Sequence, residues 1–196
     1  MIRHYDLSDF EAVRSDFLQA YSPAVKARAS FTQKKDAVVS GWNDAINDYD
    51  YVSFVTAEKF AAGTKASVRC SFDKFGAPLI VFTNDLNGDV YGLHFEAVAF
   101  EEGINVWHIV KSEPGSPKPV TVKKIGFTRF PVAAGEPFTL TVEFGYKEIR
   151  VSINGNGVTV ACEDIPEEFH VGFTGCEGVN RFYEFTVETD PERNNV

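Results

Sequence analysis

From about Asp50 to Glu188, apolar residues recur at every second position, and this alternation constrains the fold more than any other feature. In residues 138–144, for example, Phe, Leu, Val and Phe alternate with polar residues. Successive side chains of a β-strand point to opposite faces, so a period of two is typical of strands with one face in a core. The pattern predicts half-buried strands rather than helices.

We predict strands at Tyr51–Thr56, Ala66–Phe72, Pro78–Thr83, Val90–Phe100, Ile104–Lys111, Val120–Phe127, Phe138–Phe144, Glu148–Asn154, Val158–Glu163, His170–Thr174 and Arg181–Glu188. Short glycine-containing turns such as 101–103 and 154–157 connect them, and strands joined so tightly are antiparallel. A length of 196 residues with 44% hydrophobic content suits one large β domain over residues 1–196. The predicted fold is therefore all-β, a two-sheet antiparallel sandwich.

The first 30 residues follow a different pattern. Ser8-Asp9-Phe10-Glu11 has the spacing of a helix capping box, and apolar residues follow at roughly helical intervals. We predict a short helix for this segment, with a strand as the alternative. The polar residues 190–196 are expected to fray.

Charge and composition argue against several classes of partner. A formal net charge of -9 repels polyanions, so no nucleic-acid partner is expected. No apolar stretch approaches the length of a membrane span, so no membrane partner is expected either. Three widely spaced cysteines and an acidic N-terminus without a secretory signal predict a cytoplasmic protein. Since metal-loop, phosphate-loop and dinucleotide motifs are absent, we expect no metal and no cofactor, and the oligomeric state stays open.

Two segments carry a resemblance to a known superfamily. The hairpin from Gly135 to Gly155, and the Val171-Gly172-Phe173-Thr174 strand with its glycine turn and closing aromatic strand at 182–187, resemble concanavalin-A-like domains of the legume-lectin and laminin-G types. The resemblance implies a jelly roll whose members bind or cleave glycans on a concave sheet. The Glu-x-Asp-x-x-Glu strand of the retaining glucanases and the acidic metal-binding run of the legume lectins are both missing.

The segment 90–100 carries the strongest sign of chemistry. Leu93, Phe95, Ala97 and Ala99 form one apolar face, which places the side chains next to them on the other face. We therefore predict that His94 and Glu96 share a ligand-facing, concave sheet surface, where they are also the candidate catalytic groups. The alternative is an ordinary solvent-facing strand pair.

The hairpin register decides which partners they meet. If Phe100 lies opposite Asn105, Val98 faces Trp107. The side chains on the outer face then form a platform for a sugar, in which Trp107 stacks on a pyranose ring while polar groups form hydrogen bonds with its hydroxyls. The members of that platform are His94, Glu96, Asn105, Trp107 and Lys111. If Phe100 lies opposite Ile104, Glu96 instead faces His108, which suits metal binding or acid–base chemistry.

These residues support a carbohydrate-binding protein whose partner is a saccharide or similar polar ligand. Arg69 is expected on the same face, where its planar fork suits diols. The first alternative is a glycoside hydrolase-like enzyme that uses Glu96 with a second acid from Glu143, Glu148 or Glu184. The second alternative is a protein-interaction domain, recognisable by an apolar patch without a polar cleft.

Overall fold

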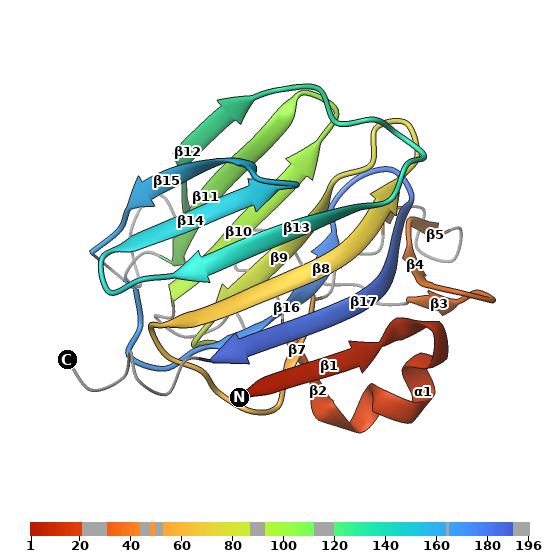
Figure 1. Cartoon of the computed structure of the whole chain (residues 1–196), viewed down its shortest axis with the longest axis horizontal. Helices are drawn as coiled ribbons and strands as arrows, with labels where there is room; N and C mark the ends of the chain where they lie inside the picture. The colour runs from red at the N-terminus through yellow and green to blue at the C-terminus, as the bar shows by residue number, and fades with distance from the viewer. Residues whose placement is uncertain are drawn as a thin grey trace.

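The structure is a computed structural model that describes residues 1–20, 31–43, 48–49, 53–86, 93–111, 120–163 and 165–189. Two antiparallel sheets pack face to face, and a short helix lies near the N-terminus (Figure 1). The predicted all-β jelly-roll sandwich is confirmed. Within the described residues, no helix is long and apolar enough to cross a membrane.

The sheet nearer the viewer in Figure 1 is called the front sheet. Its strand order is β15 (Asn156–Ala161), β14 (Glu148–Ile153), β13 (Phe138–Phe144), β8 (Thr64–Phe72), β17 (Asn180–Thr189), β4 (Val38–Ser40) and β3 (Thr32–Gln33). Strand β1 (Ile2–Asp6) also pairs with β17. Strands distant in sequence are thus neighbours, since β8 lies between β13 and β17.

The back sheet has the order β12 (Val120–Arg129), β11 (Gly103–Lys111), β10 (Leu93–Phe100), β9 (Pro78–Thr83), β16 (His170–Gly175), β7 (Ser53–Thr56) and β2 (Phe17–Ala20). A separate ribbon pairs β5 (Trp42–Asn43) with β6 (Asp48–Tyr49). After residue 50, the strand predictions agree with the structure to within a few residues at each end, except that residues 51–52 and 90–92 of the predicted strands lie outside the described part of the chain.

The core lies between the two sheets and is rich in phenylalanine. Phe82 and Phe95 stack with ring centroids 4.5 Å apart, and Phe144 of the front sheet meets Phe82 edge-on, also at 4.5 Å. The predicted β13–β14 hairpin supplies much of this core. Its inward residues are all buried, namely Phe138, Leu140, Val142, Ile149, Val151 and Ile153.

The N-terminal segment contains less helix than predicted. Within residues 1–20, only α1 (Phe10–Val13) is α-helical, between the 3-10 turns Leu7–Asp9 and Arg14–Asp16. The predicted capping box does not form, because the carboxylate of Asp6, not the Ser8 side chain, accepts a backbone N–H at the start of the first turn. This segment crosses from β1 in the front sheet to β2 in the back sheet, so its ends must be extended to join both ladders. The strand alternative was therefore correct for both ends.

Candidate functional site

The β10–β11 hairpin has a tighter register than either predicted one. Phe100 pairs with Gly103, so Glu101 and Glu102 alone form the turn. Gly103 has a φ of +138°, and a Cβ there would collide with the backbone of Thr128, so only glycine fits. Two-residue turns are the commonest connection between antiparallel strands.

The observed register keeps the same outer set as the first prediction but shifts its partners. Glu96 lies directly opposite Trp107, and Val98 lies opposite Asn105. The second prediction is wrong: Glu96 does not face His108, whose ring instead stacks on core Phe95 with centroids 4.2 Å apart. His94, Glu96, Asn105 and Trp107 therefore share the face of the back sheet that points away from the front sheet.

A groove of about 500 Å³ runs along this outer face. It is lined by Ala77, Glu96, Val98, Phe100, Asn105, Trp107, Ile109, Val122, Cys176 and Glu177. Side chains from β10 and β11 form its floor, and the residues just after β16 contribute an edge. The groove thus combines an indole, a carboxylate and an amide with aliphatic side chains, which is the mixture found in sites for small polar ligands.

The groove carboxylate belongs to a buried hydrogen-bonded pair. Nε2 of His94 lies 3.0 Å from Oε1 of Glu96, and only 1% and 7% of the two side chains are exposed. This contact orients the Glu96 carboxylate. The other ring nitrogen of His94, Nδ1, is buried with no hydrogen-bond partner within the described part of the chain.

Trp107 is half-buried between two strands. On the β12 side it pairs with Lys124, whose Nζ lies 4.8 Å from the centre of the indole ring. A cation over an aromatic face is attracted by the ring quadrupole, which helps to fix the indole. Since Lys124 covers one face of the ring, a ligand that stacks on Trp107 must use the other face.

Cys176 shows the electrostatic character of the groove. Burial raises the pKa of its thiol well above the usual range, and the negative charges of Glu96 and Glu177 raise it further. The thiol donates to the carbonyl of Ala77 across 3.7 Å. Cys176 is therefore a neutral thiol at ordinary pH, which argues against a role as nucleophile.

Two predicted site residues, Arg69 and His94, do not line the groove, and the side chain of His94 is only 1% exposed. Arg69 belongs to β8 of the front sheet and points outward, where its guanidinium lies 3.6 Å from Glu184 and 5.5 Å from the ring of Tyr183. The prediction that it shares a face with His94 is wrong, because the whole core separates the two sheets. For Lys111 only the backbone is described, and it pairs with Val120 at the end of β11.

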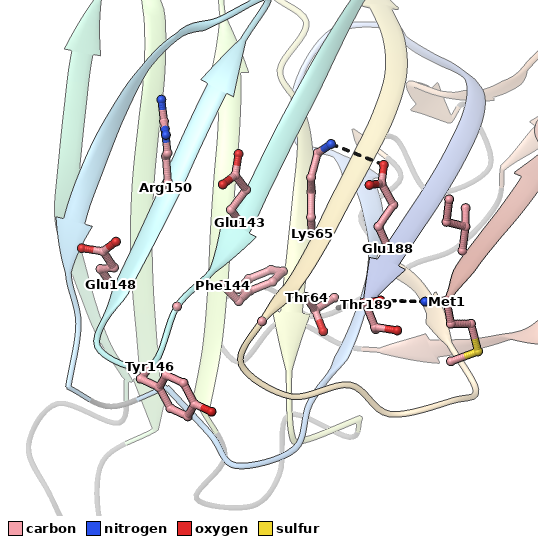
Figure 2. Close-up of a pocket in the computed structure, with 13 residues that line it drawn as sticks. Met1, Thr64, Lys65, Glu143, Phe144, Tyr146, Glu148, Arg150, Glu188 and Thr189 are labelled. Atoms are coloured by element: carbon pink, nitrogen blue, oxygen red, sulfur yellow. Dashed lines mark hydrogen bonds and ion pairs between the residues drawn. The ribbon is translucent and has the colours of Figure 1, made fainter. Parts of the chain in front are cut away.

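The three acids considered as partners of Glu96 also lie on the front sheet. Glu143, Glu148 and Glu184 alternate with buried core residues and point away from the back sheet. Figure 2 shows Glu143 and Glu148 in a different hollow, on the outer face of the front sheet. None of the three can act together with Glu96 on one ligand.

Sequence reasoning missed Cys176 and Glu177 as groove residues. Both follow β16 immediately, and β16 reaches the groove because it lies beside β9, which lies beside β10. Only the strand order reveals this proximity, since about eighty residues separate these segments in the chain. The glycine turn after β16 predicted a loop, but it did not predict which strands lie beside that loop.

No family model matches the chain, and no curated protein is similar to it in sequence. Solved structures do match over nearly the full length. A β-glucanase from Bacillus licheniformis has a TM-score of 0.62 at 10% identity, covering 96% of this chain and 98% of its own.

Two further structures show the range of the similarity. The κ-carrageenase from Pseudoalteromonas carrageenovora, solved with an oligotetrasaccharide of κ-carrageenan, has a TM-score of 0.58 at 8% identity, covering 94% and 92%. A Bacillus subtilis protein of unknown function with a galectin-like fold also has a TM-score of 0.58, at 14% identity, covering 95% and 94%. At these identities the likeness establishes the fold alone. The chain therefore has the two-sheet jelly-roll fold of these structures.

Proposed function

We propose that the groove on the outer face of the back sheet binds a saccharide. The observation that carries this proposal is the pairing of Trp107 with Glu96 across β10 and β11, with Asn105 in the same groove. The half-buried indole of Trp107 lines the groove and offers a stacking surface for the apolar side of a pyranose. The carboxylate accepts hydrogen bonds from sugar hydroxyls, and the amide both donates and accepts.

Two features make these groups suitable for a specific ligand. The Glu96 carboxylate is held by His94 and the Trp107 indole by Lys124, so neither has to be ordered when a ligand binds. The structural neighbours add support from outside the chain, since their names describe a β-glucanase and a κ-carrageenase in complex with an oligosaccharide.

A glycan array tests the proposal, with β-glucan, galactan and κ-carrageenan oligosaccharides among its members. We expect the protein to bind at least one arrayed saccharide and Trp107→Ala to lose that binding. Leu18→Ala is the control, because Leu18 is an exposed apolar residue on β2, at the edge of the back sheet opposite to β12. Failure of the wild-type protein to bind any arrayed saccharide, or equal binding by Trp107→Ala, would contradict the proposal.

Hydrolysis of the bound saccharide is a second candidate function. It is favoured by the presence of two carboxylates, Glu96 and Glu177, in one groove, because glycoside hydrolysis needs a pair of acids. Replacing Glu96 with Gln keeps its shape and removes its charge. If the protein is an enzyme, Glu96→Gln loses most of the turnover measured by reducing-sugar release; if it only binds, saccharide affinity falls modestly and the wild type shows no turnover.

A further inference from the structure

A second hollow, of about 680 Å³, lies on the outer face of the front sheet. This volume is within the range of roughly 300–1,000 Å³ that small-ligand sites occupy. Figure 2 shows it between the turn of the β13–β14 hairpin, which carries Tyr146, and the N-terminal strand. The full thickness of the core separates it from the groove on the back sheet.

Four charged side chains of alternating sign line one end of this hollow. Arg150, Glu143, Lys65 and Glu188 occupy one row across β14, β13, β8 and β17, because each is the register partner of the next. Figure 2 shows the four side chains next to one another. The row therefore presents donors and acceptors in alternation at the spacing of neighbouring strands, about 4.8 Å.

Half of this row is not used internally. Lys65 bonds Glu188 across 3.3 Å, whereas Glu143 and Arg150, although partners in the ladder, form no ion pair within the described residues. Arg150 is exposed and Glu143 half-buried, so both keep hydrogen-bonding capacity that solvent now satisfies. A bound ligand can replace that solvent.

The chemistry of the hollow selects against charged ligands. Its side chains include two cations, Lys65 and Arg150, and three carboxylates, on Glu143, Glu148 and Glu188, so opposite charges nearly balance. A sulfated or carboxylated ligand meets carboxylates at every second position. A ligand whose hydroxyls donate to Glu143 and accept from Arg150 satisfies the half of the row that forms no internal ion pair.

An exposed aromatic ring completes the hollow. The turn residue Tyr146 is 57% exposed and lines the same space. A Tyr ring presents a flat apolar surface at a low entropy cost. Aromatic stacking beside alternating donors and acceptors is a combination that fits the apolar and hydroxylated faces of a neutral sugar.

We propose that this hollow is a second saccharide site, specific for uncharged glycans, so that one domain carries two sites on opposite faces. The site stands on its own residues and does not require the groove to bind. If both sites are occupied, a single molecule can link two glycan chains.

Nuclear magnetic resonance of the labelled full chain, titrated with a β-glucan tetrasaccharide, tests this proposal. We expect saturable shifts of the backbone signals of Lys65, Glu143 and Tyr146. Tyr146→Ala should weaken binding at these signals by roughly two- to tenfold, the equivalent of one stacking contact. Phe75→Ala should leave them unchanged, and a κ-carrageenan tetrasaccharide, which is sulfated, should produce no saturable shift there.

The outcomes separate the two sites. Shifts confined to the groove residues Glu96 and Trp107 would overturn the second site and leave the first intact. Shifts confined to the hollow would support the second site and count against the first. Saturable binding of the κ-carrageenan tetrasaccharide at the hollow would overturn its specificity for uncharged glycans, and an unaltered affinity in Tyr146→Ala would overturn the stacking role. If the signals of Tyr146→Ala away from residue 146 stay at their wild-type positions, the variant is folded. A loss of saccharide binding is then not caused by misfolding.

Discussion

The outer faces of the two sheets differ sharply, although both come from strands of the same sandwich. On the front sheet, the outward residues of β8 and β13, such as Ser67 and Thr141, are polar and half-exposed. On the back sheet, the outward residues Leu79 and Val81 of β9 are completely buried. The outer face of the back sheet therefore combines buried apolar strands with a groove lined by Glu96, Asn105 and Trp107, whereas the outer face of the front sheet is mainly solvated and carries the hollow of Figure 2.

The sharpest way to break this comparison is to truncate one outward side chain on each face. Leu79→Ala should destabilise the protein by about 2–5 kcal/mol, because Leu79 is buried in a cluster with Val55 and Val81. Thr141→Ala, at a half-exposed outward position of β13, should change the free energy of unfolding by less than about 1 kcal/mol. Urea denaturation measures both. Similar losses in the two variants would show that the back face is not the more buried one.

A smaller difference is expected between polar contacts on the two faces. His94→Ala removes a hydrogen bond to the buried Glu96 carboxylate and should cost about 1–3 kcal/mol. Lys65→Ala removes the ion pair with Glu188. The side chains of Lys65 and Glu188 are 42% and 43% exposed. Solvent screens such a pair, so we expect a loss of about 1 kcal/mol or less in the same denaturation experiment. A larger loss of stability in Lys65→Ala than in His94→Ala would contradict the view that the polar contact on the back sheet is the more buried one.

Another prediction concerns the reactivity of the thiol in the groove. The charge of Glu96 helps to raise the pKa of Cys176, so Glu96→Gln should lower that pKa and increase the thiolate fraction at a fixed pH. Alkylation of Cys176 by iodoacetamide at pH 8, followed by mass spectrometry, should become a few times faster. Glu143→Gln, on the other face, is the control and should leave the rate unchanged. An unchanged rate in Glu96→Gln would place Glu96 farther from the thiol than the structure does.

The stability of the protein should also fall at high pH. Burial raises the pKa of both Cys70 and Cys176 in the folded chain, whereas the unfolded thiols keep ordinary values near 9. Below pH 9 both states are protonated and no change arises from these groups. Above it the unfolded state loses protons that the folded state retains, so the free energy of unfolding decreases as pH rises. Cys70→Ala should flatten this decline between pH 9 and 11 in a denaturation series.

The sequence predicted those features that depend on local alternation. The inward residues of the β13–β14 hairpin, and the shared face of His94 and Glu96, follow from a period of two within single strands. The continuous apolar run of β9 was predicted as a strand, but its burial on both faces requires knowledge of what lies on either side.

The errors arose where strand order or turn length decides the outcome. Arg69 and the acids Glu143, Glu148 and Glu184 belong to strands that alternate correctly, yet lie in the other sheet, and no local pattern tells one sheet from the other. The helix predicted near Phe10 is confirmed, but it is limited to Phe10–Val13 because its flanking residues pair with β17 and β7 as strands. The register of β10 and β11 depended on a two-residue turn that sequence alone leaves among several choices.

The central claim, that the groove beside Trp107 holds the saccharide, can be tested with the tryptophans themselves. The chain has only two, Trp42 and Trp107, so Trp42→Phe leaves a single reporter in the groove. We predict a saturable change in its fluorescence on titration with the oligosaccharide selected by the array, and none in Trp107→Phe, where the exposed Trp42 remains. A saturable change in Trp107→Phe together with none in Trp42→Phe would contradict the assignment of the site.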